Sequence, residues 1–216
     1  MSKLLLAVLI SVAMTLVVAG QDSDDYKKGE FFIGYSNGQI DTGIGDIDDD
    51  FGLDLGDRES FHGFNTSGVF NVNRYVGLKV DLSGAYKNRG FAFNVPTPGG
   101  GTGSIAFETK NSLYNFLGGV QIKDNSRSGT VKPFAHALFG AAYARTKISG
   151  LGCSVGIDCT GIESGSETQW AGAFGGGLDL RLSNRVQIRL VQVDYNPVFF
   201  EGGPQNNLRF GFGLVF

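Results

Sequence analysis

Few residues of this chain could supply acid–base or nucleophilic chemistry. Its two histidines are His62 and His136, and Ser60 precedes His62 by two residues. A serine beside a histidine base is the minimum for nucleophilic catalysis, but proximity in sequence does not establish the required geometry. His136 lies in the segment PFAHALFG, which has no adjacent serine or threonine. The sequence therefore predicts no catalytic residue, with a hydrolytic role for Ser60 and His62 as the alternative.

The acidic stretch between residues 41 and 59 is the strongest candidate for a metal site. Asp46, Asp48 and Asp50 have the spacing of the first three ligands of a calcium-binding loop. However, Phe51 stands where the turn of such a loop requires glycine, and Asp57 replaces the closing glutamate. We therefore expect a solvated acidic segment, and the sequence predicts no metal ion and no cofactor.

Residues 1–20 have the three-part form of a secretory signal peptide. Lys3 is followed by an uncharged apolar run from Leu4 to Val18 and then by the small residues Ala19 and Gly20. That run is shorter than the ~20 residues that a membrane-spanning helix needs. We expect cleavage near Gly20, which places the rest of the chain outside the cytoplasm.

The two cysteines, Cys153 and Cys159, lie in a segment rich in glycine and serine. Their spacing fits neither a CxxC redox motif nor a two-pair zinc site. In an oxidising compartment such a pair can close a small loop. We predict a disulfide between Cys153 and Cys159, with two free thiols as the alternative.

The composition narrows the fold class. Glycine accounts for 34 of the 216 residues and phenylalanine for 18, without the G-X-Y period of collagen. An apolar fraction of 42% argues against disorder, and a mean hydropathy of −0.01 is too low for a bundle of membrane helices. The net charge of −3 offers no basic surface for phosphates, so no nucleic-acid partner is expected.

Apolar and polar residues alternate with a period of two in several segments, as in β-strands with two different faces. Between Val76 and Tyr86 one face is bulky and apolar, whereas the other consists of Gly77, Lys79, Asp81, Ser83 and Ala85. In a soluble barrel this second face would meet water and would carry more charge and fewer glycines. Small residues and isolated charges instead suit a narrow lumen, with the phenylalanine and leucine face toward lipid.

Eight such segments are present, and the connections between them alternate between long and short, as in outer-membrane barrels. The predicted fold is all-β, an eight-stranded antiparallel transmembrane up-and-down β-barrel over residues 30–216, preceded by a periplasmic segment at 21–29. The predicted strands are Glu30–Ser36, Phe61–Asn71, Tyr75–Tyr86, Ile105–Ile122, Lys132–Thr146, Thr168–Leu182, Val186–Tyr195 and Asn207–Phe216.

Aromatic residues mark one end of these strands. On the face assigned to lipid, four of them fall next to the long connections: Tyr35, Tyr86, Tyr143 and Trp170. Tyrosine and tryptophan at that position form the girdle at the level of the lipid headgroups.

The seventh segment departs from the alternation. Continuing its pattern would place Gln192 and Asp194 in lipid, so we expect a bulge near Val191 that turns both side chains inward. The apolar stretch from Val198 to Phe200 is expected to extend this strand above the membrane.

The charges predicted to face inward form one set. The interior of an eight-stranded barrel is just wide enough for side chains to fill it, and buried charges need partners. We therefore expect ion pairs that block most of the lumen. The predicted network consists of Lys79, Asp81, Asp179, Arg181, Arg189 and Arg209, with Asn115, Gln121 and His136 also facing inward.

Three stretches, VNRYVGLKVDLSG, FGGGLDLRLSNRVQIRLVQVDYNP and NNLRFGFGLVF, resemble the small outer-membrane β-barrels related to the transmembrane domain of outer-membrane protein A and to the opacity-type porins. The resemblance covers the chain from about Glu30 onward. It implies recognition by the barrel-assembly machinery, because the family's C-terminal assembly signal is matched by Leu208, Phe210, Phe212, Leu214 and Phe216. No peptidoglycan-binding domain follows, so the chain is similar to the barrel-only members.

The sequence thus predicts a non-enzymatic barrel of the bacterial outer membrane with a structural or surface-interaction role, with its loops extracellular and both termini periplasmic. Its expected partners are outer-membrane lipid and lipopolysaccharide, the barrel-assembly machinery and an extracellular ligand of the loops. The alternatives are a narrow porin-like channel for small solutes, a lipid A-modifying barrel enzyme and a soluble periplasmic lipocalin-like carrier.

Overall fold

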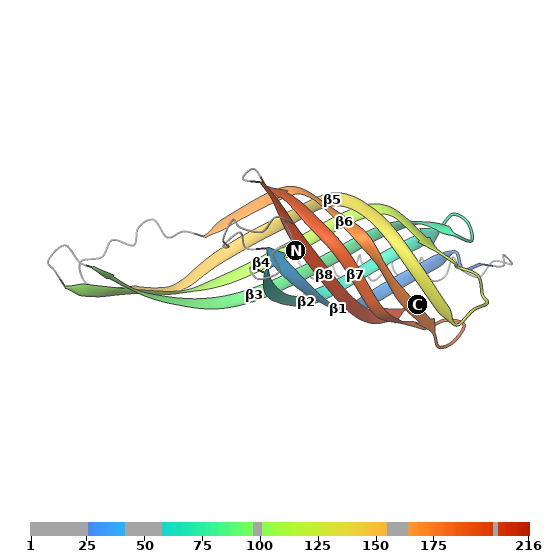
Figure 1. Cartoon of the computed structure of the whole chain (residues 1–216), viewed down its shortest axis with the longest axis horizontal. Coiled ribbons are helices and arrows are strands. Elements are labelled where there is room, and N and C mark those ends of the chain that lie inside the picture. The colour runs from blue at the N-terminus through green and yellow to red at the C-terminus, as the bar shows by residue number, and fades with distance from the viewer. Residues whose placement is uncertain (1–25, 42–57, 97–100, 155–163, 201–202) are drawn as a thin grey trace, which may run out of the picture.

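The computed structural model describes residues 26–41, 58–96, 101–154, 164–200 and 203–216. Eight strands close into one barrel in chain order (Figure 1). All neighbouring strands are antiparallel, and β1 pairs with β8 to complete the ring. The predicted up-and-down barrel is therefore confirmed. The strands are β1 (Gly29–Asp41), β2 (Arg58–Asn71), β3 (Val76–Pro96), β4 (Thr102–Lys123), β5 (Val131–Cys153), β6 (Gly165–Arg181), β7 (Gln187–Phe200) and β8 (Gly203–Val215).

Two predicted features lie outside the described residues: the signal peptide at 1–20 and the acidic stretch with Asp46, Asp48 and Asp50. Within the described part of the chain, no helix is long and apolar enough to cross a membrane.

The period-two alternation sorts the side chains between the outer wall and the lumen. In β3, Leu78 and Val80 are 55% and 51% exposed, whereas the neighbouring Lys79 and Asp81 are 1% and 0% exposed. The bulky apolar face thus points away from the barrel axis. The soluble lipocalin-like alternative is wrong, because it required that face inside.

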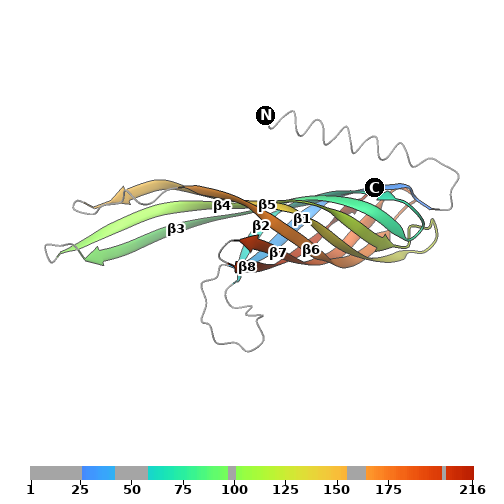
Figure 2. The same cartoon turned by 90° about the horizontal axis from the view of Figure 1, so that it is seen from above.

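Three strands are about twice as long as a membrane crossing requires. Strands β3, β4 and β5 contain 21, 22 and 23 residues, whereas a tilted strand crosses a bilayer with about 9–11. Beyond the other strands they continue as a protruding arm (Figures 1 and 2), which we define as residues 87–96, 102–111 and 145–153. The sequence had assigned most of these residues to loops. The stretch 87–96 is strand because it pairs continuously with β4, from Lys87 opposite Asn111 to Pro96 opposite Thr102.

A row of tyrosines lies on the outer wall where the arm begins. Tyr86 and Tyr114 make an edge contact with ring centroids 5.6 Å apart, and Tyr114 stacks on Tyr143 at 6.4 Å. All three rings are just under two-fifths exposed, as is Tyr35, while Trp170 is 74% exposed. The four aromatic residues named from the sequence therefore do face outward, and Tyr114 is a fifth that the sequence analysis did not name.

The bulge predicted in β7 is confirmed. The register between β7 and β8 shifts between Arg189 and Gln192, and both intervening residues face outward. As a result Gln192 and Asp194 are buried in the lumen. Further along, the stretch 198–200 continues β7 and pairs with β8, as the sequence predicted.

Glycine residues permit neighbouring strands of the barrel wall to approach each other closely. A Cβ atom on Gly175 would lie 2.1 Å from the main-chain oxygen of Val193, and one on Gly213 would lie 2.3 Å from that of Ile33. Neither position could accept a side chain without moving the neighbouring backbone, because no real Cβ comes so close to an oxygen. Such contacts account for part of the glycine excess.

The barrel end opposite to the arm is closed by tight connections, and we call it the short-turn end. The connections there span 72–75, 124–130 and 182–186, and the residues before β1 cross the second of them. Lys27 N donates to the Asn125 carbonyl at 3.1 Å. The Arg74 guanidinium donates to Asp124 across two turns at 3.0 Å and holds the pKa of that carboxyl well below its usual range.

Candidate functional site

The lumen contains a central ion-pair cluster built around Arg209 on β8. Its guanidinium donates to Asp194 Oδ2 at 2.6 and 2.9 Å and to Asp81 Oδ1 at 2.8 Å. Asn65 donates to Asp81 at 2.9 Å, and Ser83 Oγ accepts from Arg209 at 2.9 Å. Strands β8, β7, β3 and β2 are therefore tied together across the interior rather than only along their edges.

Lys79 and His136 extend this central cluster toward β5. Lys79 Nζ lies 3.1 Å from His136 Nδ1 and 4.0 Å from Asp81 Oδ2. His136 Nε2 lies 2.9 Å from Asp194 Oδ1. The histidine is thus held between a cation and a carboxylate as a structural member of the cluster.

A second cluster lies closer to the short-turn end and is centred on Asp179. Arg189 binds this carboxylate with two donors, at 2.8 and 3.2 Å, and Lys123 Nζ lies 2.8 Å from it. Lys123 also donates to Glu30 at 3.0 Å and to Gln187 at 3.0 Å. Glu30 and Lys123 were not named in the sequence analysis, although each sits on the inward parity of its strand.

Arg189 joins the two clusters. Its Nη1 donates to Gln192 at 2.7 Å, and Gln192 Nε2 donates to Asp194 at 2.7 Å. The guanidinium carbon lies 4.2 Å from the ring centroid of Phe32 and 4.0 Å from that of Phe134. Two lumenal aromatic rings therefore enclose this cation, a favourable arrangement once the guanidinium is desolvated.

The buried charges of the two clusters balance. Within the two clusters, four cations and four carboxylates are each at most 4% exposed, namely Lys79, Lys123, Arg189, Arg209, Glu30, Asp81, Asp179 and Asp194. Lys132, also 4% exposed, lies outside them at the short-turn end. Burying a charge without a partner costs several kcal/mol. The one-to-one match, together with the amide and hydroxyl contacts, makes the two clusters a neutral, cross-linked core.

Toward the arm, the lumen contains an apolar cluster as well as polar side chains, whereas the sequence predicts only small residues and charges there. Leu117 and Leu138 are fully buried, and they pack in one inward cluster whose other members are Ile40, Phe61, Leu113, Ala142, Ala171, Ala173 and Val198. Composition does not predict these inward leucines, because it assigns bulky apolar residues to the outer face of the barrel. The lumen is thus closed at two levels, first by ion pairs and then by apolar packing.

Arg181 is the one predicted network member that the structure places elsewhere. Its guanidinium donates to Asn184 at 2.8 Å in the turn after β6, at a half-buried position of the short-turn end. Arg181 belongs to the same face of β6 as Asp179, which points inward. However, it lies two residues closer to the end of the strand, beyond the buried clusters. The other inward assignments agree with the structure: Asn115 is 5% exposed and donates to Ser83, and Gln121 is 1% exposed.

The hydrolytic alternative required Ser60 to meet His62. Asn37 donates to the Ser60 hydroxyl at 2.7 Å, and His62 Nδ1 instead contacts the hydroxyl of Tyr35. Both residues sit on the outer face of β2, since the intervening Phe61 is buried in the lumen. This arrangement gives the serine no base. Among the described residues, no three His, Cys, Asp or Glu side chains are placed to hold a metal ion.

Two further predicted sets are only partly described. Cys153 at the tip of β5 is disulfide-bonded, whereas Cys159 lies outside the described residues, so their pairing stays a prediction. The five residues of the predicted assembly signal, Leu208, Phe210, Phe212, Leu214 and Phe216, alternate along the outer wall of β8 and its end. Their recognition by assembly machinery also stays a prediction.

Solved structures with the same fold are outer-membrane barrels. Neisserial surface protein A superposes with a TM-score of 0.54 at 10% identity, covering 89% of this chain and 98% of that one. Ail, the attachment invasion locus protein of Yersinia pestis, in complex with the heparin analogue sucrose octasulfate, superposes with a TM-score of 0.50 at 19% identity, covering 87% and 97%. No protein-family model and no curated protein matches the sequence. The chain has the fold of these small barrels.

Replacing Arg209 with methionine should strongly destabilise the barrel. The substitution keeps a long side chain but leaves the carboxylates of Asp81 and Asp194 buried without their cation. We expect a loss of about 3–5 kcal/mol in the free energy of unfolding, measured by urea titration of the refolded protein. Arg181→Met is the matched control and should change stability by less than about 1 kcal/mol, because that half-buried side chain makes one hydrogen bond in a turn and pairs with no buried carboxylate. Equal losses in the two variants would contradict the central role of Arg209.

The doubly closed lumen should not conduct ions. In a planar bilayer the refolded protein should produce no discrete conductance steps above those of the empty membrane. Reproducible steps that scale with protein concentration would show that the buried clusters open, and they would favour the narrow-channel alternative.

Proposed function

We propose that this chain is an integral protein of the bacterial outer membrane with a structural and surface-interaction role. Its barrel anchors the protein in the membrane, and the arm formed by β3, β4 and β5 is the surface that binds other molecules. The arm and the long connections lie outside the cell, and the short-turn end with both chain termini lies in the periplasm. Signal-peptide cleavage near Gly20 and assembly through the C-terminal segment belong to the same proposal.

The observation that carries this proposal is the apolar outer wall bordered by tyrosines. From Leu78 to Tyr86 the outward positions of β3 carry no charge, and the segment from Val76 at the short-turn end to Tyr86 contains 11 residues. That length matches a tilted crossing of the hydrocarbon core. A closed barrel leaves no unpaired strand edge, as a lipid environment requires.

The closed lumen separates this proposal from the two alternatives that remain. A narrow channel needs a continuous aqueous path. The interior is instead filled by ion pairs and by the apolar cluster that contains Leu117 and Leu138. A lipid A-modifying enzyme needs a nucleophile beside a base, and Ser60 and His62 have other partners. The interaction role therefore rests on the surface of the arm.

Membrane placement is tested by fractionation and heat-dependent gel mobility. The full chain, expressed in a Gram-negative host, should sediment with the outer membrane. It should migrate as a compact species in detergent before boiling and shift after boiling, because a closed ladder of hydrogen bonds resists the detergent. Recovery in the soluble periplasmic fraction would overturn the proposal.

The outer surface of the arm offers a site for lipid phosphates. Directly beyond the paired Tyr114 and Tyr143, Ser112 lies opposite Arg145 and Lys110 lies opposite Lys147. Cross-strand partners share a face, and these three exposed cations are two to four residues past the tyrosines, or about 7–13 Å. We call Lys110, Arg145 and Lys147 the outer basic cluster.

The outer basic cluster is unfavourable by itself. Like charges directly opposite each other destabilise a sheet, and the anion on the same face is Glu108, opposite Ser149. Phosphate groups at the membrane surface would neutralise the cluster. This supports lipopolysaccharide as a partner of the outer surface.

Arg145→Gln with Lys147→Gln should reduce stabilisation by lipopolysaccharide. In phospholipid nanodiscs, adding lipopolysaccharide should raise the thermal midpoint of the wild type by several degrees, since a ligand of the folded state shifts unfolding. The double variant should lose most of this rise. Arg181→Gln with Arg185→Gln removes the same charge from the opposite end and should retain it. An unchanged rise in the first variant would rule out the outer basic cluster as the contact.

An extracellular sulfated ligand is the second candidate for the same cluster. Ail, which shares the fold, was solved with the heparin analogue sucrose octasulfate, and sulfate and phosphate groups accept the same charge-assisted hydrogen bonds. Competition between soluble sucrose octasulfate and lipopolysaccharide in the nanodisc assay would support this ligand class.

A further inference from the structure

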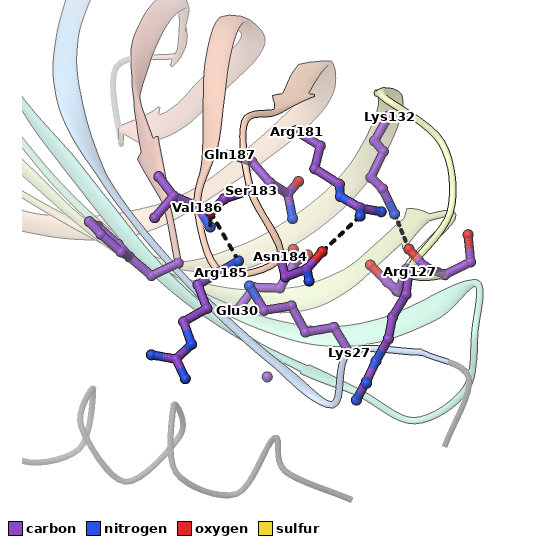
Figure 3. A pocket seen from close by; sticks show the side chains of 14 residues that line it. Lys27, Glu30, Arg127, Lys132, Arg181, Ser183, Asn184, Arg185, Val186 and Gln187 are labelled. Carbon is purple, nitrogen blue, oxygen red and sulfur yellow. Dashed lines mark hydrogen bonds between the residues drawn. The ribbon is translucent and has the colours of Figure 1, made fainter. Parts of the chain in front are cut away.

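The short-turn end contains a cavity that the proposed surface role does not use. It has a volume of about 810 Å³, within the range of small-molecule pockets. Residues from four separate stretches of the chain line it (Figure 3): 27–30 up to the start of β1, 125–132 around the turn before β5, 181–187 around the turn before β7, and Phe216 after β8. The cavity lies at the barrel mouth, next to the Asp179 cluster.

Positive charge dominates the lining of this cavity. Five cationic side chains line it, Lys27, Arg127, Lys132, Arg181 and Arg185. The lining carboxylate is Glu30, which is already engaged by Lys123. Among the lining side chains that the structure describes, positive charges therefore outnumber negative ones five to one.

The cations are close enough to affect one another. Lys132 lies within electrostatic range of Lys123 and Arg181, and Lys27 lies within range of Lys123 and Lys132. Burial lowers the pKa of the Lys27 ammonium, and the two lysines lower it further against the opposing effect of Glu30. The protein thus holds like charges together at an energetic cost, which a bound anion would remove.

Two buried groups at this site have no hydrogen-bond partner. Asn125 is 2% exposed and lines the cavity, yet neither its amide nitrogen nor its amide oxygen is bonded. Lys27 Nζ is likewise buried without an acceptor. Lys132 is oriented by the carbonyl oxygen of Asp124, to which its Nζ donates at 3.0 Å. Unsatisfied buried donors are rare in folded proteins, and a bound ligand with acceptor oxygens would satisfy these two.

We propose that the short-turn mouth of the barrel is a binding site for a phosphate group. Arg181 and Arg185 supply planar guanidinium donors, Lys27 and Lys132 supply ammonium groups, and the Asn125 amide donates from the cavity wall. Phosphate offers several acceptor oxygens and a charge near −2, and guanidinium groups bind such oxygens in pairs. This site is distinct from the outer basic cluster, which lies at the far end of the barrel.

The phosphate can come from a soluble anion or from the headgroup of an anionic phospholipid. Pyrophosphate is the probe for the first source. The full chain, refolded in a nonionic detergent at low ionic strength, should bind pyrophosphate in a calorimetric titration. The affinity should fall steeply with added salt, because screening weakens exposed charges.

Arg181→Gln with Arg185→Gln should weaken pyrophosphate binding at least tenfold, and Lys27→Gln should also weaken it. Lys87→Gln with Arg89→Gln removes equal charge from the arm outside the outer basic cluster and should change the affinity by less than twofold. The heat-dependent gel shift of each variant verifies that it folds. Arg181 is half-buried and Arg185 is exposed, and both lie outside the buried clusters, so loss of folding is an unexpected outcome.

The lipid source is tested in nanodiscs. If phosphatidylglycerol, added to phosphatidylcholine discs, weakens pyrophosphate binding through competition, the headgroup occupies the site. If binding is the same in both kinds of disc, the site takes a soluble phosphate. Absence of pyrophosphate binding in detergent, or an equal loss of affinity in the arm variant, would overturn the proposal.

Discussion

The contact of the Arg209 guanidinium with Asp81 and Asp194 is the interaction on which the interior depends. Because one side chain from β8 reaches carboxylates on β3 and β7, it holds these strands together through the lumen, in addition to the hydrogen bonds between neighbouring strands. An eight-stranded barrel has too little internal space for water to solvate such charges. Each charge must therefore be matched by a side chain, and the four cations and four carboxylates satisfy that requirement.

The closure of the sheet has further consequences along the barrel axis. Around Asp179 and Asp194 the inward positions are charged, whereas nearer the arm they are leucine and alanine. The apolar layer needs no electrostatic partner, and it separates the charged interior from the arm side. The two ends of the molecule are consequently independent surfaces. One presents a cationic cavity at the short turns, and the other presents a long three-stranded arm.

Side-chain parity made most of the interior predictable. Lys79, Asp81 and Asp179 lie between outward apolar residues, so the alternation places them in the lumen without any three-dimensional information. The same rule located the β7 bulge, because without it Gln192 and Asp194 would face lipid. Composition, in contrast, misled for Leu117 and Leu138, which are as apolar as the outer wall but occupy the inward positions of their strands.

Alternation in the sequence by itself determined the fold class, the face of each strand and the identity of most lumenal charges, because a strand repeats every two residues and lipid tolerates only one kind of face. The tertiary structure alone decided how far each strand runs and which charges meet. The arm exists because residues 87–96 find partners on β4 despite a composition typical of loops. Arg181 shares the parity of Asp179 but lies outside the network, because depth along the barrel is set by strand register, which period-two patterning does not encode.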